Sequence, residues 1–119
     1  MPHPRKLGTE AEDLAAHYLA DKGMTVLKRR YKSGAGEADL VALDGQTLVF
    51  VEVKSTRSAT TQPEARVTGD KVRRLTVAAH RYIAETEFSP DAVRFDLVTV
   101  TPDGINHIAG SFWGSDTDR

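Results

Sequence analysis

A glutamate and a lysine stand two positions apart at the end of an apolar run, residues 48–54, which reads Leu-Val-Phe-Val-Glu-Val-Lys. Because side chains of a strand alternate between its two faces, Glu52 and Lys54 are expected on the same face. A second acid, Asp39, lies in the preceding apolar segment. Carboxylates gathered beside an ammonium group could bind a divalent cation and assist the hydrolysis of a phosphodiester bond.

The segment that joins the two apolar runs decides whether Asp39 and Glu52 meet. Residues 37–43 and 48–54 are expected to form a hairpin, because Asp-Gly at positions 44 and 45 is a signal for a tight turn. A four-residue loop at 44–47 sets Leu43 opposite Leu48, which places Asp39 opposite Glu52. A two-residue loop instead sets Glu37 opposite Glu52. An unbulged three-residue loop would turn Asp39 to the other side of the sheet. In either even-numbered register four side chains share one face: Glu37, Asp39, Glu52 and Lys54.

Three acids placed so closely need a compensating cation, since opposed like charges destabilise a strand pair and an unpartnered buried carboxylate is costly. Lys54 alone cannot balance them. The chain has no cysteine, and its 4 histidines show no paired ligand spacing. Oxygen ligands remain, and they favour Mg²⁺ or Mn²⁺ over zinc. The expected cofactor is therefore Mg²⁺ or Mn²⁺, held by Asp39 and Glu52.

Hydrophobic periodicity predicts the elements that position these residues. Two helices are expected, at about 9–22 and 70–86, with Asp70 as the cap of the second. Three further strands are expected, at 24–27, 93–101 and 105–109. The basic run at 28–32 is expected to end the first strand. The order α-β-β-β-α-β-β predicts an α/β fold of three layers, with a mixed sheet between the helices.

Length and composition limit the organisation of the chain. With 119 residues, 39% of them hydrophobic, there is room for one core, so a single domain over 1–119 is expected. Residues 55–68 contain Pro63 and no periodicity, which predicts a mobile loop, and residues 114–119 are expected to be a frayed tail. No stretch has the pattern of a signal peptide or a bilayer span, so a cytoplasmic protein without membrane contact is expected.

The distribution of charge bears on a nucleic-acid partner. The net charge of -1 argues against a uniformly basic body, so any nucleic-acid site must be local. Residues 54–81 carry seven Lys or Arg and two acids, whereas residues 85–119 carry seven acids and two Arg. Ordinary helix surfaces also carry such charges, so this asymmetry supports a nucleic-acid partner without requiring one. The candidate phosphate-binding residues are Arg29, Arg30, Lys71 and Arg74.

The motif Gly-Glu-Ala-Asp-Leu-Val at 36–41, followed by Val-Phe-Val-Glu-Val-Lys at 49–54, resembles the signature of the YraN-like family, a bacterial group with the restriction-endonuclease-like fold. Blocks at 12–19, 71–75 and 94–98 are also similar to that family, so the resemblance covers about residues 8–100.

The resemblance implies the PD-(D/E)xK nuclease arrangement, with Asp39, Glu52 and Lys54 as catalytic residues. It also implies Glu12 of the first helix as a further metal ligand. Ala38 stands where many such nucleases carry a proline, a position that varies widely among them.

The function implied is Mg²⁺-dependent hydrolysis of phosphodiester bonds in DNA, and in structured DNA by analogy with junction-resolving relatives of the fold. The alternative is a non-catalytic module for nucleic-acid binding or protein interaction that retains the fold. A small domain offers little surface for wrapping a duplex, and relatives that cut both strands tend to pair, so the sequence leaves room for a homodimer.

Overall fold

A computed structural model of the chain describes residues 4–56 and 68–110. The predicted tail at 114–119, and the predicted loop at 55–68 apart from its ends, lie outside the described residues. The described elements follow the predicted order: α1 (Pro4–Asp21), β1 (Thr25–Ser33), β2 (Gly36–Asp44), β3 (Thr47–Ser55), α2 (Gly69–Thr86), β4 (Ala92–Thr101) and β5 (Gly104–Ile108).

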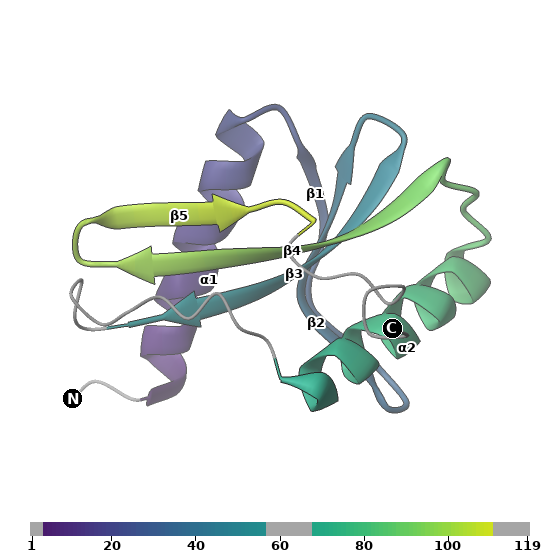
Figure 1. Cartoon of the computed structure of the whole chain (residues 1–119), viewed down its shortest axis with the longest axis horizontal. Coiled ribbons are helices and arrows are strands. Elements are labelled where there is room, and N and C mark those ends of the chain that lie inside the picture. The colour runs from purple at the N-terminus through teal and green to yellow at the C-terminus, as the bar shows by residue number, and fades with distance from the viewer. Residues whose placement is uncertain (1–3, 57–67, 111–119) are drawn as a thin grey trace.

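The strands form one mixed sheet in the order β1-β2-β3-β4-β5. Strands β3 and β4 are parallel, with α2 between them in the chain, and the other neighbours are antiparallel. Figure 1 shows α1 and α2 on opposite faces of this sheet. The predicted α/β fold with three layers is therefore confirmed.

The apolar run of β3 explains why both helices pack on the sheet. Leu48 and Phe50 belong to the core cluster on the α2 side, and Val49 and Val51 belong to the cluster on the α1 side. All four side chains are fully buried. A strand that is apolar on both faces must be covered on both, since each face removes its own apolar surface from water.

The start of α2 differs from the prediction. The N-cap is Thr68, whose hydroxyl accepts a hydrogen bond of 3.2 Å from the backbone N–H of Lys71. Asp70 lies in the first turn instead, where its negative charge is still favourable beside the unpaired N–H groups of the helix.

Strand β1 also differs from the prediction, because the basic run at 28–32 lies within the strand and does not end it. Since β1 is at the edge of the sheet, most of its charged side chains remain exposed to water. The pairing with β2 shifts by one residue between Val26 and Lys28.

The hairpin between β2 and β3 has the register in which Leu43 faces Leu48. Asp44 and Thr47 pair as well, so the loop contains only Gly45 and Gln46 and is shorter than the four residues expected for this register. Because Leu43 faces Leu48, the alternative register, in which Glu37 lies opposite Glu52, is wrong.

Within the ranges that the structure describes, no helix is both long and apolar enough to cross a membrane.

Candidate functional site

The candidate site lies where β2 and β3 part. Their pairing extends from Asp44 and Thr47 to Leu40 and Val51, so Asp39 and Glu52 are the next residues along each strand. The carboxylate of Asp39 reaches across to β3, where its Oδ2 accepts a hydrogen bond of 2.7 Å from the backbone N–H of Val53. The hairpin thus brings the two predicted acids together at the end of its ladder.

The simple alternation of side chains breaks down at Asp39. Ala38 packs in the cluster on the α2 side and Leu40 in the cluster on the α1 side, although the two are only two residues apart. On β1, Arg30 has a φ of 55°, a left-handed conformation that is strained for a residue with a side chain. Asp39 therefore lies at a break in the alternation of β2.

Glu52 is buried and forms an ion pair with a lysine of α2. Its side chain is 8% exposed, and its Oε2 accepts a hydrogen bond of 2.7 Å from Nζ of Lys71, in the first turn of α2. The cation that compensates Glu52 is therefore not Lys54, the lysine of its own strand.

Asp39 has a pKa raised to about 7. Burial is the largest cause, and the negative charge of Glu52 is the second; the hydrogen bond from Val53 acts in the opposite direction and does not offset them. Glu12 adds a smaller increase, and Lys71 a small decrease. Near neutral pH, Asp39 is therefore divided between the protonated and the ionised form.

Glu12 of α1 lies near this pair, and Arg30 holds it. Nε of Arg30 donates a hydrogen bond of 2.8 Å to Oε1 of Glu12, whose side chain is 13% exposed. A cavity of about 290 Å³ opens here, and its lining includes Glu12, Arg30, Lys32, Glu37 and Asp39. The predicted third metal ligand thus shares a cavity wall with Asp39.

Lys54 follows Glu52 on β3 and is paired with Thr99 of β4 in the sheet. Its side chain is exposed and makes no hydrogen bond or ion pair with any other described residue. By the alternation of β3 it lies on the same side as Glu52, so its ammonium group is available to a ligand.

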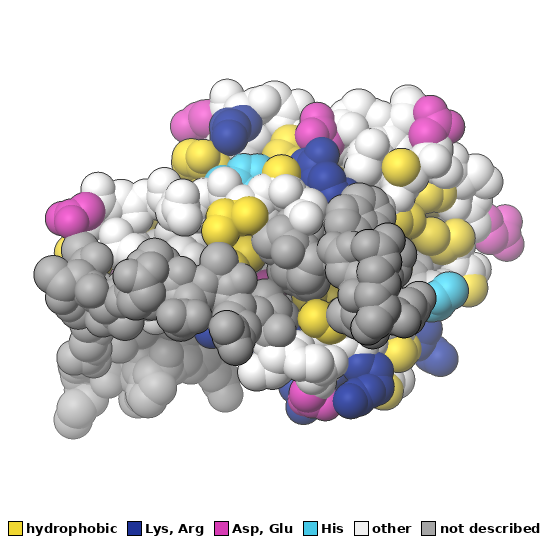
Figure 2. All heavy atoms as spheres, in the orientation of Figure 1, with side chains coloured by type: hydrophobic (Ala, Val, Ile, Leu, Met, Phe, Trp, Pro, Cys, Tyr) yellow, Lys and Arg dark blue, Asp and Glu magenta, His cyan; other side chains and the backbone are white. Residues whose placement is uncertain are grey.

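The four predicted phosphate-binding residues are all engaged with acids. Arg29 pairs with Asp13, Arg30 with Glu12, Lys71 with Glu52, and Arg74 with Asp70 at 3.0 Å and Glu37 at 3.5 Å. Figure 2 shows dark blue basic side chains beside a magenta acidic one over the lower end of α2. A phosphate group approaching these cations therefore competes with carboxylates that are already in place.

The chemistry of the site suits a hard divalent cation. Among the side chains that the structure describes, no group of three His, Cys, Asp or Glu forms a ready-made metal centre. Asp39 and Glu52 nevertheless supply two carboxylates, and burial followed by the negative charge of Glu52 raises the pKa of Asp39, so a cation beside them would favour the ionised form. Oxygen donors with excess negative charge fit Mg²⁺ or Mn²⁺.

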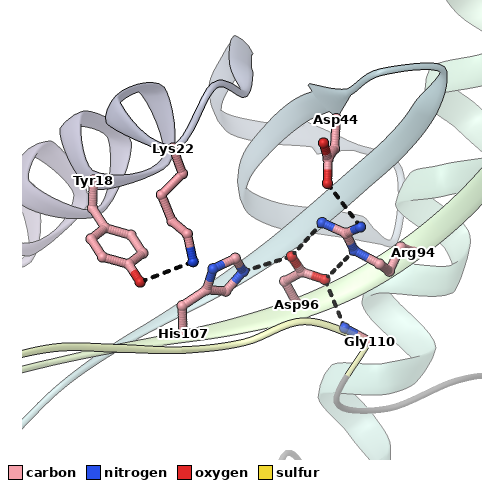
Figure 3. A network of polar contacts seen from close by, with 7 residues as sticks. All are labelled: Tyr18, Lys22, Asp44, Arg94, Asp96, His107 and Gly110. Atoms are coloured by element: carbon pink, nitrogen blue, oxygen red, sulfur yellow. Dashed lines mark hydrogen bonds and ion pairs between the residues drawn. The ribbon is translucent and has the colours of Figure 1, made fainter.

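A second polar cluster, which the sequence reasoning did not identify, lies on the face of β4 that is turned toward α1 (Figure 3). Asp96 is fully buried and accepts hydrogen bonds from Arg94 at 2.9 and 3.1 Å and from the backbone N–H of Gly110 at 2.9 Å. Nε2 of His107 lies 2.8 Å from its Oδ2, and Arg94 also donates to Asp44 at 3.0 Å. The only sequence signal was an acid inside an apolar strand. We call these four side chains the Asp96 network: Asp44, Arg94, Asp96 and His107.

The model of a family described as "Uncharacterised protein family UPF0102" matches residues 11–100. A "UPF0102 protein" of Thermotoga petrophila is 44% identical over 105 residues, which cover 88% of this chain and 95% of that protein. A relative in Rhodococcus opacus is 42% identical and covers 84% of this chain and 86% of its own. One in Chlorobium limicola is 35% identical and covers 95% and 97%.

A solved structure, described as the "Crystal structure of SSO0001", is similar with a TM-score of 0.43 and 19% sequence identity. The similarity covers 89% of this chain and 51% of that one, so this chain spans about half the length of that protein.

Proposed function

This chain belongs to the uncharacterised protein family UPF0102, and from that premise we propose that it is a metal-dependent nuclease that hydrolyses phosphodiester bonds in DNA. The resemblance to the YraN-like family is confirmed, because YraN belongs to the same family. The family is named without an activity, so the proposal rests on the site itself.

One observation carries the proposal: two carboxylates, Asp39 and Glu52, meet where the hairpin opens, and a lysine with an available ammonium group follows on the same strand. Structural ion pairs place an acid next to a base, whereas this site places an acid next to an acid. Such an arrangement is unfavourable for folding and is typical of sites that bind or activate a ligand.

In this proposal Asp39 and Glu52 hold Mg²⁺ or Mn²⁺, with Glu12 as the third candidate ligand. When bound, such a cation lowers the pKa of water and offsets the negative charge that grows on the phosphate. Glu52 accepts the hydrogen bond from Lys71, and Asp39 loses its proton as the pH rises through about 7.

Lys54 orients the attacking water and donates to an oxygen of the scissile phosphate. The oxygen of the water forms a bond to phosphorus and its proton passes to solvent, while the bond from phosphorus to the leaving ester oxygen breaks. The leaving oxygen takes up a proton from solvent.

The test is cleavage of labelled four-way junction, flap, single-stranded DNA and RNA substrates with Mn²⁺. The wild type is expected to cut at least one DNA substrate, and D39N and K54A are expected to lose about 100-fold or more of that activity. D103N and K22Q are the matched controls, because they remove the same charges from the turn between β4 and β5 and from the turn that follows α1, and they should retain activity. Equal cutting by D39N and the wild type would refute the proposal.

The second candidate, a nucleic-acid-binding module without catalysis, is favoured by four basic side chains that are 43 to 49% exposed, those of Arg29, Arg30, Lys71 and Arg74. Cations at the surface can bind phosphate groups without any metal chemistry, once a phosphate replaces the carboxylate partner of each. Binding of the same panel with no cutting in Mg²⁺ or Mn²⁺ would favour this candidate.

A further inference from the structure

Lys71 contacts the candidate metal site from α2, whereas Lys54 belongs to β3. It lies in the first turn of α2, and its ammonium group covers Glu52 from the solvent side at 2.7 Å. The lysine side chain is 46% exposed, whereas the glutamate side chain is 8% exposed. The carboxylate is therefore fixed by the sheet, and the ammonium group is the partner that can move.

The ammonium group of Lys71 lies among several negative charges. Its pKa is raised, first by the hydrogen bond to Glu52 and then by the charges of Glu52, Asp39 and Glu37, against the opposing effect of burial. Two of these acids, Asp39 and Glu52, are the candidate ligands of a divalent cation. The single positive charge of Lys71 thus acts on three carboxylates.

The two lysines of the site are in different states. Lys71 is engaged with Glu52, whereas Lys54 makes no polar contact with another described residue. The ammonium group occupies Oε2 of Glu52, so a divalent cation that binds Oε2, alone or together with Oε1, displaces it.

We propose that Lys71 is a resident cation that the divalent metal ion displaces from Glu52, and that the released ammonium group then binds a phosphate of the nucleic-acid substrate. This inference rests on the proposed function. The exchange needs only a rotation of an exposed side chain into solvent, and α2 can stay where it is. Metal and nucleic acid then favour each other's binding, because the metal releases a phosphate ligand.

The first experiment measures Mn²⁺ binding to the full-length, EDTA-treated chain by calorimetry. K71Q removes the competitor and is expected to bind Mn²⁺ about threefold to tenfold more tightly than the wild type. R74Q is the matched control, because Arg74 is on the same helix and 47% exposed but pairs with Asp70 and Glu37. It removes the same charge and is expected to change the affinity less.

Weaker Mn²⁺ binding by K71Q, or a change no larger than that of R74Q, would overturn the inference. Equal binding by the wild type and K71Q overturns this inference and leaves the proposed function intact. If neither binds Mn²⁺, with or without DNA, the metal premise of the proposed function fails too. Binding by K71Q alone supports the inference most directly.

The second experiment needs no variant and no activity. Acetylation of lysines, followed by mass spectrometry, compares the labelling of Lys71 and Lys54 with and without Mg²⁺ at one pH. Lys71 is expected to react severalfold faster once the metal is present, whereas Lys54 is expected not to gain reactivity. Unchanged labelling of Lys71 at a Mg²⁺ concentration that saturates the protein would overturn the displacement.

Discussion

Two aspartates on the interior strands β2 and β4, which flank β3, have opposite surroundings. Asp96, on β4, is fully buried, yet its pKa is lowered: burial opposes ionisation, but hydrogen bonds from His107, Arg94 and Gly110 outweigh it. Asp39, on β2, is partly buried, and its pKa is raised to about 7. Burial alone therefore does not decide the charge state; the number of donors around the carboxylate does.

The comparison separates a stabilising cluster from a functional one. Asp96 is surrounded by donors on both of its oxygens, whereas Asp39 has one backbone donor and a neighbouring acid. The first arrangement is complete without a ligand. The second is improved by any cation that enters, which is the property expected of a binding site.

The largest effect is expected for D96A. Removing this carboxylate leaves the buried side chain of His107 without its acid and leaves Arg94 paired with Asp44 alone, so the free energy of unfolding should fall by about 3–5 kcal/mol. Urea unfolding at pH 7 measures it, with D103A in the exposed turn after β4 as the control, expected to change stability by less than about 0.5 kcal/mol. D96N keeps some of the acceptors and should lose less. A loss below about 1 kcal/mol in D96A would show that the Asp96 network does not stabilise the fold.

The opposite sign is expected for D39N. An acid whose folded-state pKa is raised destabilises the fold increasingly as the pH rises from its ordinary value through about 7. Removing the charge should therefore stabilise the metal-free chain by about 2–4 kcal/mol at pH 8 and by about 1–2 kcal/mol at pH 5. Urea unfolding in EDTA at both pH values measures the difference, and D103N again is the control. Destabilisation by D39N at pH 8 would contradict the raised pKa.

A smaller effect is expected on the binding of Mn²⁺ as the pH changes. The metal needs the ionised form of Asp39, so affinity should rise between pH 6 and pH 8, by at most about tenfold per pH unit below the pKa. Calorimetry of the wild type and D39N measures it, and the slope should be lost in the variant. A D39N variant with the same pH dependence would assign the proton to another group.

The smallest effect distinguishes the acids around Asp39. Glu52 raises its pKa more than Glu12 does, so E52Q should lower that pKa by more than E12Q. The change for E12Q is expected to be about a few tenths of a pH unit, as for a partly screened charge. A ¹³C NMR titration of the Asp39 carboxyl carbon follows both variants. The reverse ranking would place Glu12 closer to Asp39 in solution than it lies here.

Much of the hairpin and its acids could be predicted from local signals. The Asp-Gly turn and the two apolar runs were enough to predict the hairpin and to limit its register to a few alternatives, one of which has Leu43 opposite Leu48 as in the structure. These features depend on residues close together in the chain, for which turn chemistry and alternation are informative.

The partners of the acids could not be predicted in the same way. Lys71 reaches Glu52 only because α2 packs at one position on the sheet, and tertiary packing decides that position. The left-handed backbone conformation of Arg30 could not be predicted either, because arginine is not a residue type that favours it. His107 meets Asp96 through the pairing of β4 with β5, a register that no local pattern specifies.

The position of α2 depends on a missing side chain. A Cβ atom at Gly36 would lie 2.6 Å from the backbone nitrogen of Ala78 and 2.7 Å from its Cα, and backbone cannot yield as a flexible side chain can. A single methyl group there would clash with the helix backbone and push α2 away from β2. The same helix carries Lys71, so the smallest residue of the hairpin sets how closely the two layers approach and, through that spacing, how well an ammonium group covers Glu52.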